Sequence, residues 1–260
     1  MKNKILIIAG SDSCGGAGVQ ADIKTATSLK TYCASAISCL TAQNSQKVFD
    51  ISYPPIDFVA KQIAAVIEDI KIDAIKIGML GNSQITNEVT KILEEKAKNI
   101  PIITDPVMVS TSGDILFKKD ALESLKKLIS HSFLTTPNIP EAEILSAMKI
   151  NNLEDVKIAA RKIKEIGVKN VLIKGGHLDS KDKIFNFLLK EDGTEKTFTN
   201  KKLDLGEIHG TGCTLATAIA CFISQGFELE NSFKKATSFV LKTIRNSQKI
   251  GKGSRILKHY

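Results

Sequence analysis

Short apolar runs that alternate with amphipathic segments constrain the fold of this 260-residue chain more than any other feature. Runs typical of buried strands lie at residues 4–9, 33–42, 73–77, 100–104, 132–135 and 170–173. Between these runs the apolar residues recur with helical spacing, as between residues 59 and 70 and between residues 156 and 167. Strands that alternate with helices form right-handed βαβ units. The pattern therefore predicts an α/β fold with a mostly parallel sheet, covered by helices on both faces.

The alternation changes towards the carboxyl end of the chain. Residues 183–189 and 194–199 flank a turn that contains Gly193, which predicts a β-hairpin. Two helical patterns follow at about 211–224 and 229–246. Because no repeat, low-complexity stretch or linker interrupts the chain, we expect one domain over residues 1–260. Ligands of open α/β sheets bind beyond the carboxyl ends of the strands, so candidate site residues are sought there.

Composition excludes several classes of protein. The net charge is +8, but only Arg161, Arg245 and Arg255 are arginines, and neither a basic cluster nor an RNA-binding signature is present. We therefore expect no nucleic-acid partner. The apolar runs are too short to span a membrane or to form the core of a signal peptide. Five cysteines without a C-x-x-C pair argue against a disulfide framework and a structural zinc site. The expected location is cytoplasmic, with no membrane partner.

A glycine-rich loop, Gly10-Ser-Asp-Ser-Cys-Gly-Gly-Ala-Gly18, follows the first predicted strand and precedes a helical pattern at 19–29. Its four glycines permit a close approach of the backbone to a ligand. The fragment from Gly16 to Ala21 formally meets the dinucleotide-binding fingerprint, but it lies several residues beyond the strand end. The second strand also ends at Gln43 without an acid that could bind a ribose. A ligand-binding loop and a purely structural turn both remain open.

A second glycine motif, His209-Gly-Thr-Gly-Cys-Thr-Leu215, opens an apolar helical pattern. Gly210 and Gly212 bracket Thr211, so several unpaired N–H groups should converge at the positive end of the helix dipole. Such a nest suits a phosphoryl group or another oxyanion. Cys213 falls in the first turn, where thiol pKa values tend to be lowered. The alternative is a glycine-tightened helix start with a buried cysteine. The P-loop look-alike at 251–254 lacks the leading glycine, the strand and the helix.

Acidic and basic residues follow several of the predicted strands. Asp105 and Glu141 are candidate ligands of Mg²⁺, which proteins typically hold with one or two carboxylates plus substrate phosphates. Helix capping is the alternative, and it suits Asn138 better than Asp105. Lys76 and Lys174 can reach phosphates or extend to solvent. The four histidines lack metal-ligand spacing, so we expect them at the surface or in packing roles.

Together these segments resemble the hydroxymethylpyrimidine and phosphomethylpyrimidine kinases of thiamin biosynthesis, within the ribokinase-like superfamily. The likeness runs over nearly the whole chain, in order and at family spacing. It covers residues 9–13, 15–18, 20–25, 40–44, 76–80, 105–109, 112–114, 136–138, 140–142, 174–177 and 209–215. Each segment alone is a weak signal, but their order and spacing make the set specific.

The resemblance implies a ribokinase-like three-layer α/β/α sandwich, with ATP as phosphoryl donor and Mg²⁺ as cofactor. It also implies two successive phosphorylations, first of the hydroxymethyl group of a small-molecule pyrimidine and then of the resulting monophosphate. Asp22 and Gln43 would face the aminopyrimidine edge, and Met79 and Val107 would pack against its ring. Cys213 would be the catalytic residue, in the anion nest of Gly210, Thr211 and Gly212. Lys174 and Thr211 would contact the nucleotide. Asp105 and Glu141 would lie near the metal and the phosphates.

Two other functions stay open. Pyridoxal or pyridoxine kinase has the same fold, and Gln43 is the discriminating residue because a carboxamide matches an amino group beside a ring nitrogen. A non-catalytic nucleotide or pyrimidine sensor is the alternative outside enzymes, and a homodimer is left open. The chain departs from the family pattern at Cys14, where glycine is usual, and in the tail at 251–259, which lacks a Gly-Pro pair. We expect the tail departure to affect only a peripheral segment.

Overall fold

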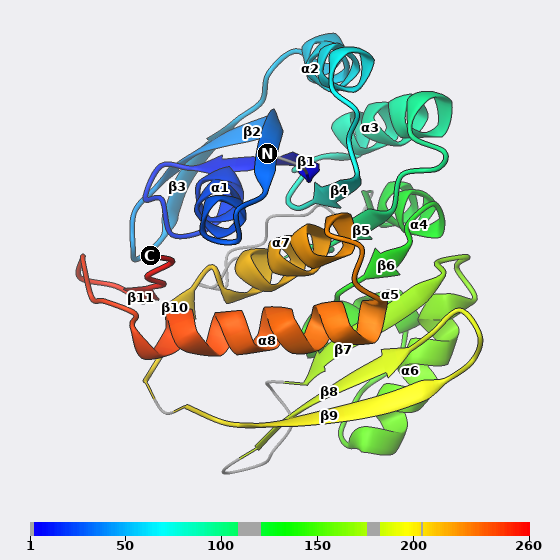
Figure 1. The fold of residues 1–260 in the computed structure, drawn as a ribbon, viewed down its shortest axis with the longest axis vertical. Helices are drawn as coiled ribbons and strands as arrows, with labels where there is room; N and C mark the ends of the chain where they lie inside the picture. Colours follow the sequence, from blue (N-terminus) through cyan, green and yellow to red (C-terminus); the bar gives the residue numbers. More distant parts are fainter. Residues whose placement is uncertain (1–2, 109–120, 176–182, 204) are drawn as a thin grey trace.

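A computed structural model describes residues 3–108, 121–175, 183–203 and 205–260, and Figure 1 shows their arrangement. The strands are β1 (Lys4–Asp12), β2 (Tyr32–Gln43), β3 (Val48–Ser52), β4 (Ala74–Ile77), β5 (Ile102–Thr104), β6 (Leu134–Thr135), β7 (Asn170–Gly175), β8 (Lys183–Leu189), β9 (Glu195–Lys201), β10 (Ile208–His209) and β11 (Arg255–Ile256). The helices are α1 (Gly18–Ser28), α2 (Ile56–Asp69), α3 (Ser83–Lys96), α4 (Leu122–Ser130), α5 (Ile139–Ser146), α6 (Leu153–Lys164), α7 (Thr211–Ser224) and α8 (Leu229–Arg245).

One large sheet runs through the described part of the chain in the order β3-β2-β1-β4-β5-β6-β7-β8-β9. Strands β2, β1, β4, β5, β6 and β7 are parallel to their neighbours in that series. Strands β3, β8 and β9 pair antiparallel, and β8 and β9 form the expected hairpin. The expected α/β class, with a mostly parallel central sheet and a C-terminal hairpin, is confirmed.

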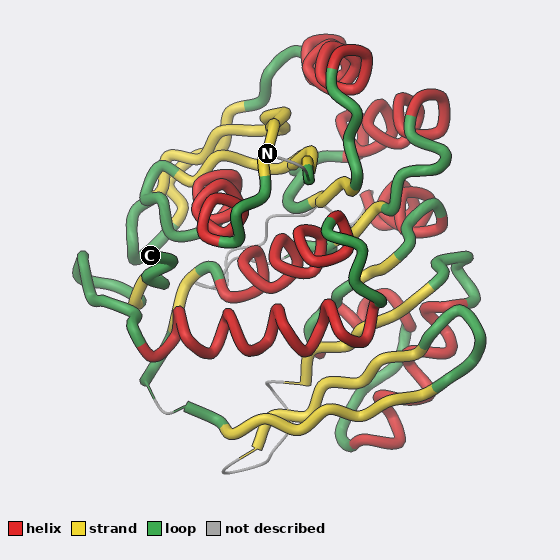
Figure 2. Tube along the Cα trace, viewed as in Figure 1, coloured by secondary structure: helices red, strands yellow, loops and turns green. Residues whose placement is uncertain are grey.

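Helices cover both faces of this sheet, as alternate side chains of β1 illustrate. Leu6 and Ile8 pack in a core formed with α2, α3, α4, α5 and α6. Ile5 and Ile7 pack in a second core formed with α1, α7 and α8, and Figure 2 shows α7 and α8 side by side across that face. All four side chains are fully buried, and burying each contributes about 1.5–3 kcal/mol. The two cores make the fold a three-layer α/β/α sandwich.

Two features of the fold differ from the sequence-based expectations. β3 was not expected, because it is an exposed edge strand whose Phe49 is 58% exposed, so it shows no buried apolar run. β11 pairs with β10 in a separate parallel ladder, with His209 opposite Ile256. The expectation of a peripheral tail was therefore wrong, because this ladder joins the tail to the residue that precedes Gly210.

Among the described residues, no helix is long and apolar enough to cross a membrane. Three parts of the resembling segments lie outside the described residues: position 109, residues 112–114 and the last two residues of 174–177.

Candidate active site

A cavity of about 720 Å³ opens at the carboxyl ends of the parallel strands, where ligands of such sheets bind. Its size is in the range of small-molecule sites. All of the predicted site residues except Asp22 line it: Gln43, Met79, Asp105, Val107, Glu141, Lys174, Gly210, Thr211, Gly212 and Cys213. The fold thus brings together residues from both ends of the chain.

One glycine lets the glycine-rich loop pack against the start of α7, and another lets the two ends of that loop approach each other. Gly210 has a φ of +86°, and a Cβ atom there would lie 1.9 Å from the carbonyl oxygen of Gly16. Gly18 has a φ of +55°, and a Cβ atom there would lie 2.4 Å from the carbonyl oxygen of Gly10. Both positions therefore require glycine for backbone conformation and for space. The close approaches that these two glycines permit are therefore between backbone segments of the protein itself.

Asp12 holds the glycine-rich loop in shape. Its carboxylate accepts hydrogen bonds from the backbone N–H groups of Cys14, Gly16 and Ala17 at 2.8, 3.0 and 2.8 Å. Nε2 of His209 lies 3.0 Å from Oδ2 of the same carboxylate. Burial alone would raise the pKa of Asp12, but the hydrogen bonds from His209 and the loop outweigh it and leave the pKa below its usual value. Cys14 contributes only its backbone here, so the departure from glycine leaves this anchor intact.

The N-terminus of α7 faces the cavity without a side-chain cap from the described residues. The first-turn N–H groups of Thr211, Gly212 and Cys213 are of the kind that has no partner within a helix. A Cβ atom on Gly212 would lie 3.3 Å from Oδ2 of Asp105 and 3.4 Å from Nζ of Lys174. The nest, a carboxylate and an ammonium group thus meet at one end of the cavity, an arrangement suited to an anionic group with a metal ion.

Asp105 and Lys174 form an ion pair on the cavity wall. Nζ of Lys174 lies 2.7 Å from Oδ1 of Asp105, whose side chain is 3% exposed. The hydroxyl of Thr136 donates to the same oxygen at 2.9 Å. Burial alone would lower the pKa of Lys174, but Asp105 and Glu141 outweigh it and raise the pKa. Asp105 caps no helix in the described structure, so the capping alternative does not account for it.

Glu141 has a capping role in the structure. Its Oε2 accepts a hydrogen bond from the N–H of Asn138 at 2.8 Å, and its own N–H donates to Oδ1 of Asn138 at 2.9 Å. This reciprocal pair is a capping box at the start of α5. Burial raises the pKa of Glu141 to about 7, with Lys174 lowering it and Asp105 raising it. The capping alternative is therefore present, and a metal role for Glu141 would have to be compatible with it.

Asp22 lies behind the cavity wall instead of on it. Its Oδ2 pairs with Nζ of Lys76 at 2.7 Å, and its Oδ1 accepts a hydrogen bond from Thr217 at 2.7 Å. Asp22 and Lys76 are both fully buried. This position differs from the expectation that Asp22 faces the aminopyrimidine edge. Lys76 lines the cavity, so Asp22 would influence a ligand through that ammonium group.

Cys213 does not have the lowered pKa that its place in the first turn of a helix suggested. Burial raises the pKa of its thiol to about 11, and this effect is larger than the opposing effects of the Lys76 ammonium and the Gly18 N–H. The side chain is half-buried and lines the cavity beside the nest. The expectation of a lowered pKa was wrong because desolvation of the thiolate outweighs the favourable charges around it.

Gln43, Met79 and Val107 also line the cavity. Gln43 is half-buried and its carboxamide lies between Thr41 and His209. Met79 and Val107 are also half-buried and add apolar surface to the cavity wall. A carboxamide beside apolar side chains can bind a flat ring that has a paired donor and acceptor on one edge.

Sequence reasoning missed several residues of the site. His209 was expected at the surface or in a packing role, yet it is buried in contact with Asp12 and lines the cavity. Lys76 was expected to reach phosphates or extend to solvent, whereas it is fully buried and paired with Asp22. Thr217 lies two turns into α7, outside any motif. The available signal was a lysine, Lys76, inside an apolar run typical of a buried strand. A buried lysine needs an acidic partner, but the spacing of residues did not identify that partner as Asp22.

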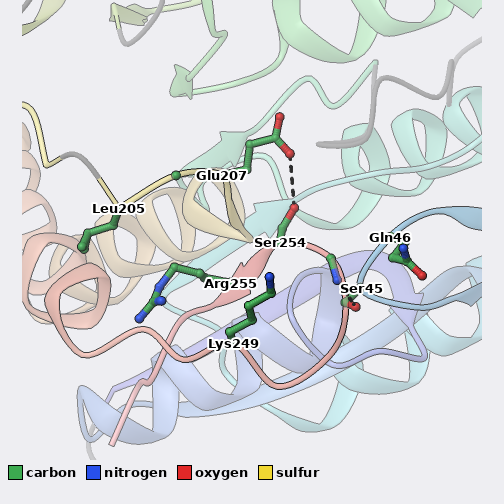
Figure 3. Close-up of a pocket in the computed structure, with 9 residues that line it drawn as sticks. Ser45, Gln46, Leu205, Glu207, Lys249, Ser254 and Arg255 are labelled. Atoms are coloured by element: carbon green, nitrogen blue, oxygen red, sulfur yellow. Dashed lines mark hydrogen bonds between the residues drawn. The ribbon is translucent and has the colours of Figure 1, made fainter.

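A second cavity, of about 590 Å³, lies where the chain before β11 meets the turn after β2 (Figure 3). The hydroxyl of Ser254 donates to Oε2 of Glu207 at 3.4 Å. The N–H groups of Gly253 and Ser254 donate to Oγ and the carbonyl oxygen of Ser45, at 3.1 and 3.0 Å. Because these N–H groups bind the turn, the P-loop look-alike at 251–254 does not form a phosphate nest.

Comparison with known proteins shows the family of the chain. The family described as phosphomethylpyrimidine kinase matches residues 12–258. The hydroxymethylpyrimidine/phosphomethylpyrimidine kinase of Bacillus subtilis is 39% identical over 258 residues, which are 99% of this chain and 94% of that protein. The chain spans only 52% of the bifunctional thiamine biosynthesis protein ThiED of Geobacter sulfurreducens, to which it is 39% identical over 259 residues.

Solved structures place the chain among small-molecule kinases. The phosphomethylpyrimidine kinase of Clostridium difficile superposes with a TM-score of 0.83 at 38% identity, covering 94% of this chain and 100% of that one. The pyridoxal kinase of Bacillus subtilis, solved as an ADP complex, superposes with a TM-score of 0.90 at 29% identity, covering 100% and 98%. The expected ribokinase-like kinase fold is confirmed. This chain is a kinase, and it belongs to the phosphomethylpyrimidine kinase family.

Proposed function

We propose that this protein, acting as a single domain, uses ATP to phosphorylate 4-amino-5-hydroxymethyl-2-methylpyrimidine and then phosphorylates the monophosphate. The observation that carries the proposal is the arrangement of the cavity. One cavity is lined by the α7 nest with Asp105 and Lys174, by the Gln43 carboxamide with Met79 and Val107, and by Cys213. A phosphoryl group and an aminopyrimidine can therefore bind in one cavity.

The acceptor site would bind the ring through one polar edge and two apolar side chains. Gln43 offers a carbonyl oxygen to the amino group and an N–H to the neighbouring ring nitrogen. Met79 and Val107 would cover the ring, and Asp22 would act through Lys76 without touching the ring. A buried polar edge without partners costs about 1–3 kcal/mol, so this pairing favours an aminopyrimidine over rings that lack it.

The donor site would stabilise the transferring phosphoryl group by position and charge. The N–H groups of Thr211, Gly212 and Cys213 would donate to its oxygens, and Lys174 would add a positive charge.

The acidic residues of this donor site fit Mg²⁺ because Asp105 and Glu141 offer hard oxygen ligands on the cavity wall. The described residues hold no cluster of three or more acidic, histidine or cysteine ligands, so phosphate oxygens and water would complete the coordination. When bound, Mg²⁺ supplies charge neutralisation to the phosphates.

Cys213 would take the proton of the hydroxymethyl group as that oxygen attacks phosphorus. With a pKa of about 11, only about one thiol in 10,000 is ionised at pH 7, so the thiolate is scarce but strongly basic. Among the groups around the thiol, the Lys76 ammonium favours the thiolate most. We therefore assign to Lys76, which Asp22 holds in place, a positioning role next to Cys213.

The test is an ADP-release assay with Mg-ATP and three acceptors: the hydroxymethylpyrimidine, its monophosphate and pyridoxine. The proposal expects kcat/KM for both pyrimidines to exceed that for pyridoxine by at least tenfold. Pyridoxal kinase is the second candidate, favoured by the TM-scores near 0.9 of several pyridoxal kinases, and it predicts the reverse order. Ligand binding without ADP release would indicate a sensor instead.

A further inference from the structure

The carboxamide of Gln43 lies between two polar groups on the cavity wall. One terminal atom is 3.1 Å from Oγ1 of Thr41, which is also 3.0 Å from the carbonyl oxygen of Ser11. The other terminal atom is 3.1 Å from Nε2 of His209, which is also 3.0 Å from Oδ2 of Asp12. The hydrogen atoms available to these neighbours decide which end of the carboxamide is oxygen and which is nitrogen.

Asp12 determines the proton on His209. Its carboxylate is ionised, because the loop N–H groups that it accepts keep it in that form. An ionised carboxylate only accepts hydrogen bonds, so Nε2 of His209 must carry a hydrogen. An N–H group at Nε2 cannot pair with the NH₂ of a carboxamide. The structure has the carboxamide nitrogen next to His209 and the oxygen next to Thr41. The hydrogen on Nε2 of His209 requires the opposite orientation, with the carboxamide turned over and its oxygen next to His209.

Thr41 is satisfied by the same orientation. Its hydroxyl has one hydrogen, and two acceptors beside it would compete for that hydrogen. If the hydroxyl donates to the carbonyl of Ser11, its lone pair faces Gln43 and can accept from the NH₂ group. The single Nε2 hydrogen of His209 is then shared between Asp12 and the carboxamide oxygen, and neither end of the carboxamide faces a group of its own kind. The backbone of Gln43 is held as well, since its N–H donates to Oγ of Ser13 at 2.8 Å.

The orientation of this carboxamide sets the direction of a bound aminopyrimidine. Along the polar edge of the substrate, the ring nitrogen N3 comes first, then the 4-amino group, then the 5-hydroxymethyl group. The amino group must face the amide oxygen and N3 must face the amide nitrogen. With the oxygen towards His209, the hydroxymethyl group extends past His209 towards Gly210–Cys213. With the carboxamide nitrogen towards His209, the ring would turn over, and the hydroxymethyl group would extend away from the nest.

We propose that His209, held by Asp12, is a positioning residue that fixes the Gln43 carboxamide and so directs the hydroxymethyl group towards the α7 nest. This inference rests on the proposed function, because it concerns how the same pyrimidine binds. It has a consequence for selectivity. The 4-oxo analogue carries an oxygen at C4 and a hydrogen on N3, so it needs the opposite orientation of the carboxamide. The fixed carboxamide rejects that analogue.

The test compares kcat/KM for the 4-amino substrate and the 4-oxo analogue in wild type, His209→Leu and His209→Gln. A mispaired edge should make wild type prefer the amino compound by at least about 100-fold. In His209→Leu the carboxamide is free to turn over, so the ratio should fall at least tenfold, with KM for Mg-ATP unchanged. His209→Gln should restore most of the ratio, because the Asp12 carboxylate orients the NH₂ of the new side chain towards itself. His131→Leu is the matched control, since the His131 ring pairs with Glu94 near the surface and does not line the cavity.

A second measurement needs no variant that could misfold. The ¹⁵N chemical shift of His209 Nε2 in the wild-type protein should be that of a protonated, pyrrole-type nitrogen. A pyridine-type shift, or an unchanged selectivity ratio in folded His209→Leu, would overturn the inference and leave the proposed function standing. Failure of wild type to phosphorylate the amino compound would overturn the proposed function, and this inference with it.

Discussion

Nζ of Lys76 lies 2.7 Å from Oδ2 of Asp22, and neither side chain is exposed to solvent. The pair joins the end of β4 to α1, and Thr217 of α7 completes it with a hydrogen bond to Asp22. Burial alone would lower the pKa of Lys76, but the surrounding anionic groups outweigh it and raise the pKa. A buried pair of this kind costs desolvation energy, so its value lies more in the charge that it holds next to Cys213 than in stability.

Lys76→Met should destabilise the protein by about 3–5 kcal/mol, because it leaves the Asp22 carboxylate buried without its counter-ion. Urea unfolding measures the loss. Lys61→Met is a matched control, since Lys61 pairs with Asp57 at the same 2.7 Å but on the surface, and it should change stability little. The double variant Lys76→Met with Asp22→Leu should recover much of the stability without recovering activity. Equal losses of stability in Lys76→Met and Lys61→Met would contradict the burial argument.

Gly210→Ala and Gly226→Ala separate backbone strain from close packing. Both glycines have nearly the same φ, +86° and +87°, but only Gly210 has a backbone atom within 2 Å of its potential Cβ. Gly226→Ala should cost about 1–2 kcal/mol of stability and leave activity unchanged. Gly210→Ala should cost more and, by shifting the nest, lower kcat/KM for Mg-ATP on the order of 100-fold. Normal activity in folded Gly210→Ala would rule out the nest as the phosphoryl site.

Asp105→Asn should lower turnover on the order of 100-fold and raise the Mg²⁺ concentration needed for half-maximal activity. The loss of stability should be small compared with the loss of turnover, because asparagine keeps a carbonyl acceptor and Glu141 still interacts with Lys174. Thr136→Val is the matched control: it removes the hydrogen bond to the same carboxylate but leaves the charge. It should lower stability by about 1 kcal/mol and leave the Mg²⁺ dependence unaltered. A normal Mg²⁺ dependence in Asp105→Asn would argue against a metal role for Asp105.

Cys213→Ala should impair the first phosphorylation by about 100- to 10,000-fold, the usual range for a general base, and the second much less. A phosphate monoester has a second pKa near 6 and needs no base at neutral pH. The pH profile adds a sharper test. Because the thiol pKa is about 11, the thiolate fraction rises about tenfold per pH unit between pH 7 and 9, and so should the first-step rate in wild type. The rise should be absent in Cys213→Ala.

Cys221→Ala serves as the control for this prediction, because Cys221 is buried in the same helix and does not line the cavity. It should affect both steps equally, through stability alone. The same factor for both steps in Cys213→Ala would mean that Cys213 supports the helix start and is not a base.

Periodicity was sufficient to predict the parallel part of the sheet, because a strand covered on both faces has an apolar central run, such as residues 5–9 of β1 and 171–173 of β7. It could not reveal β3, whose exposed Phe49 carries no burial signal, or the two-residue ladder of β10 and β11. The glycine motifs and the strand-end acids also pointed to the cavity that the fold forms.

The misplaced site residues share one physical cause. Asp22 was assigned to the aminopyrimidine edge through the family resemblance, and nothing in the sequence shows that Lys76 neutralises it from another element. The pKa of Cys213 depends on burial, which a helix position does not report. Such pairings across elements depend on the tertiary structure, and single-sequence patterns carry no information about them.

The central claim, two successive phosphorylations at one site, is tested most directly by stoichiometry. A limiting amount of 4-amino-5-hydroxymethyl-2-methylpyrimidine is incubated to completion with the enzyme and excess Mg-ATP, and the ADP released is counted per pyrimidine consumed. The account predicts two ADP per hydroxymethylpyrimidine and one ADP per monophosphate supplied. One ADP per hydroxymethylpyrimidine, with none from the monophosphate, would contradict it.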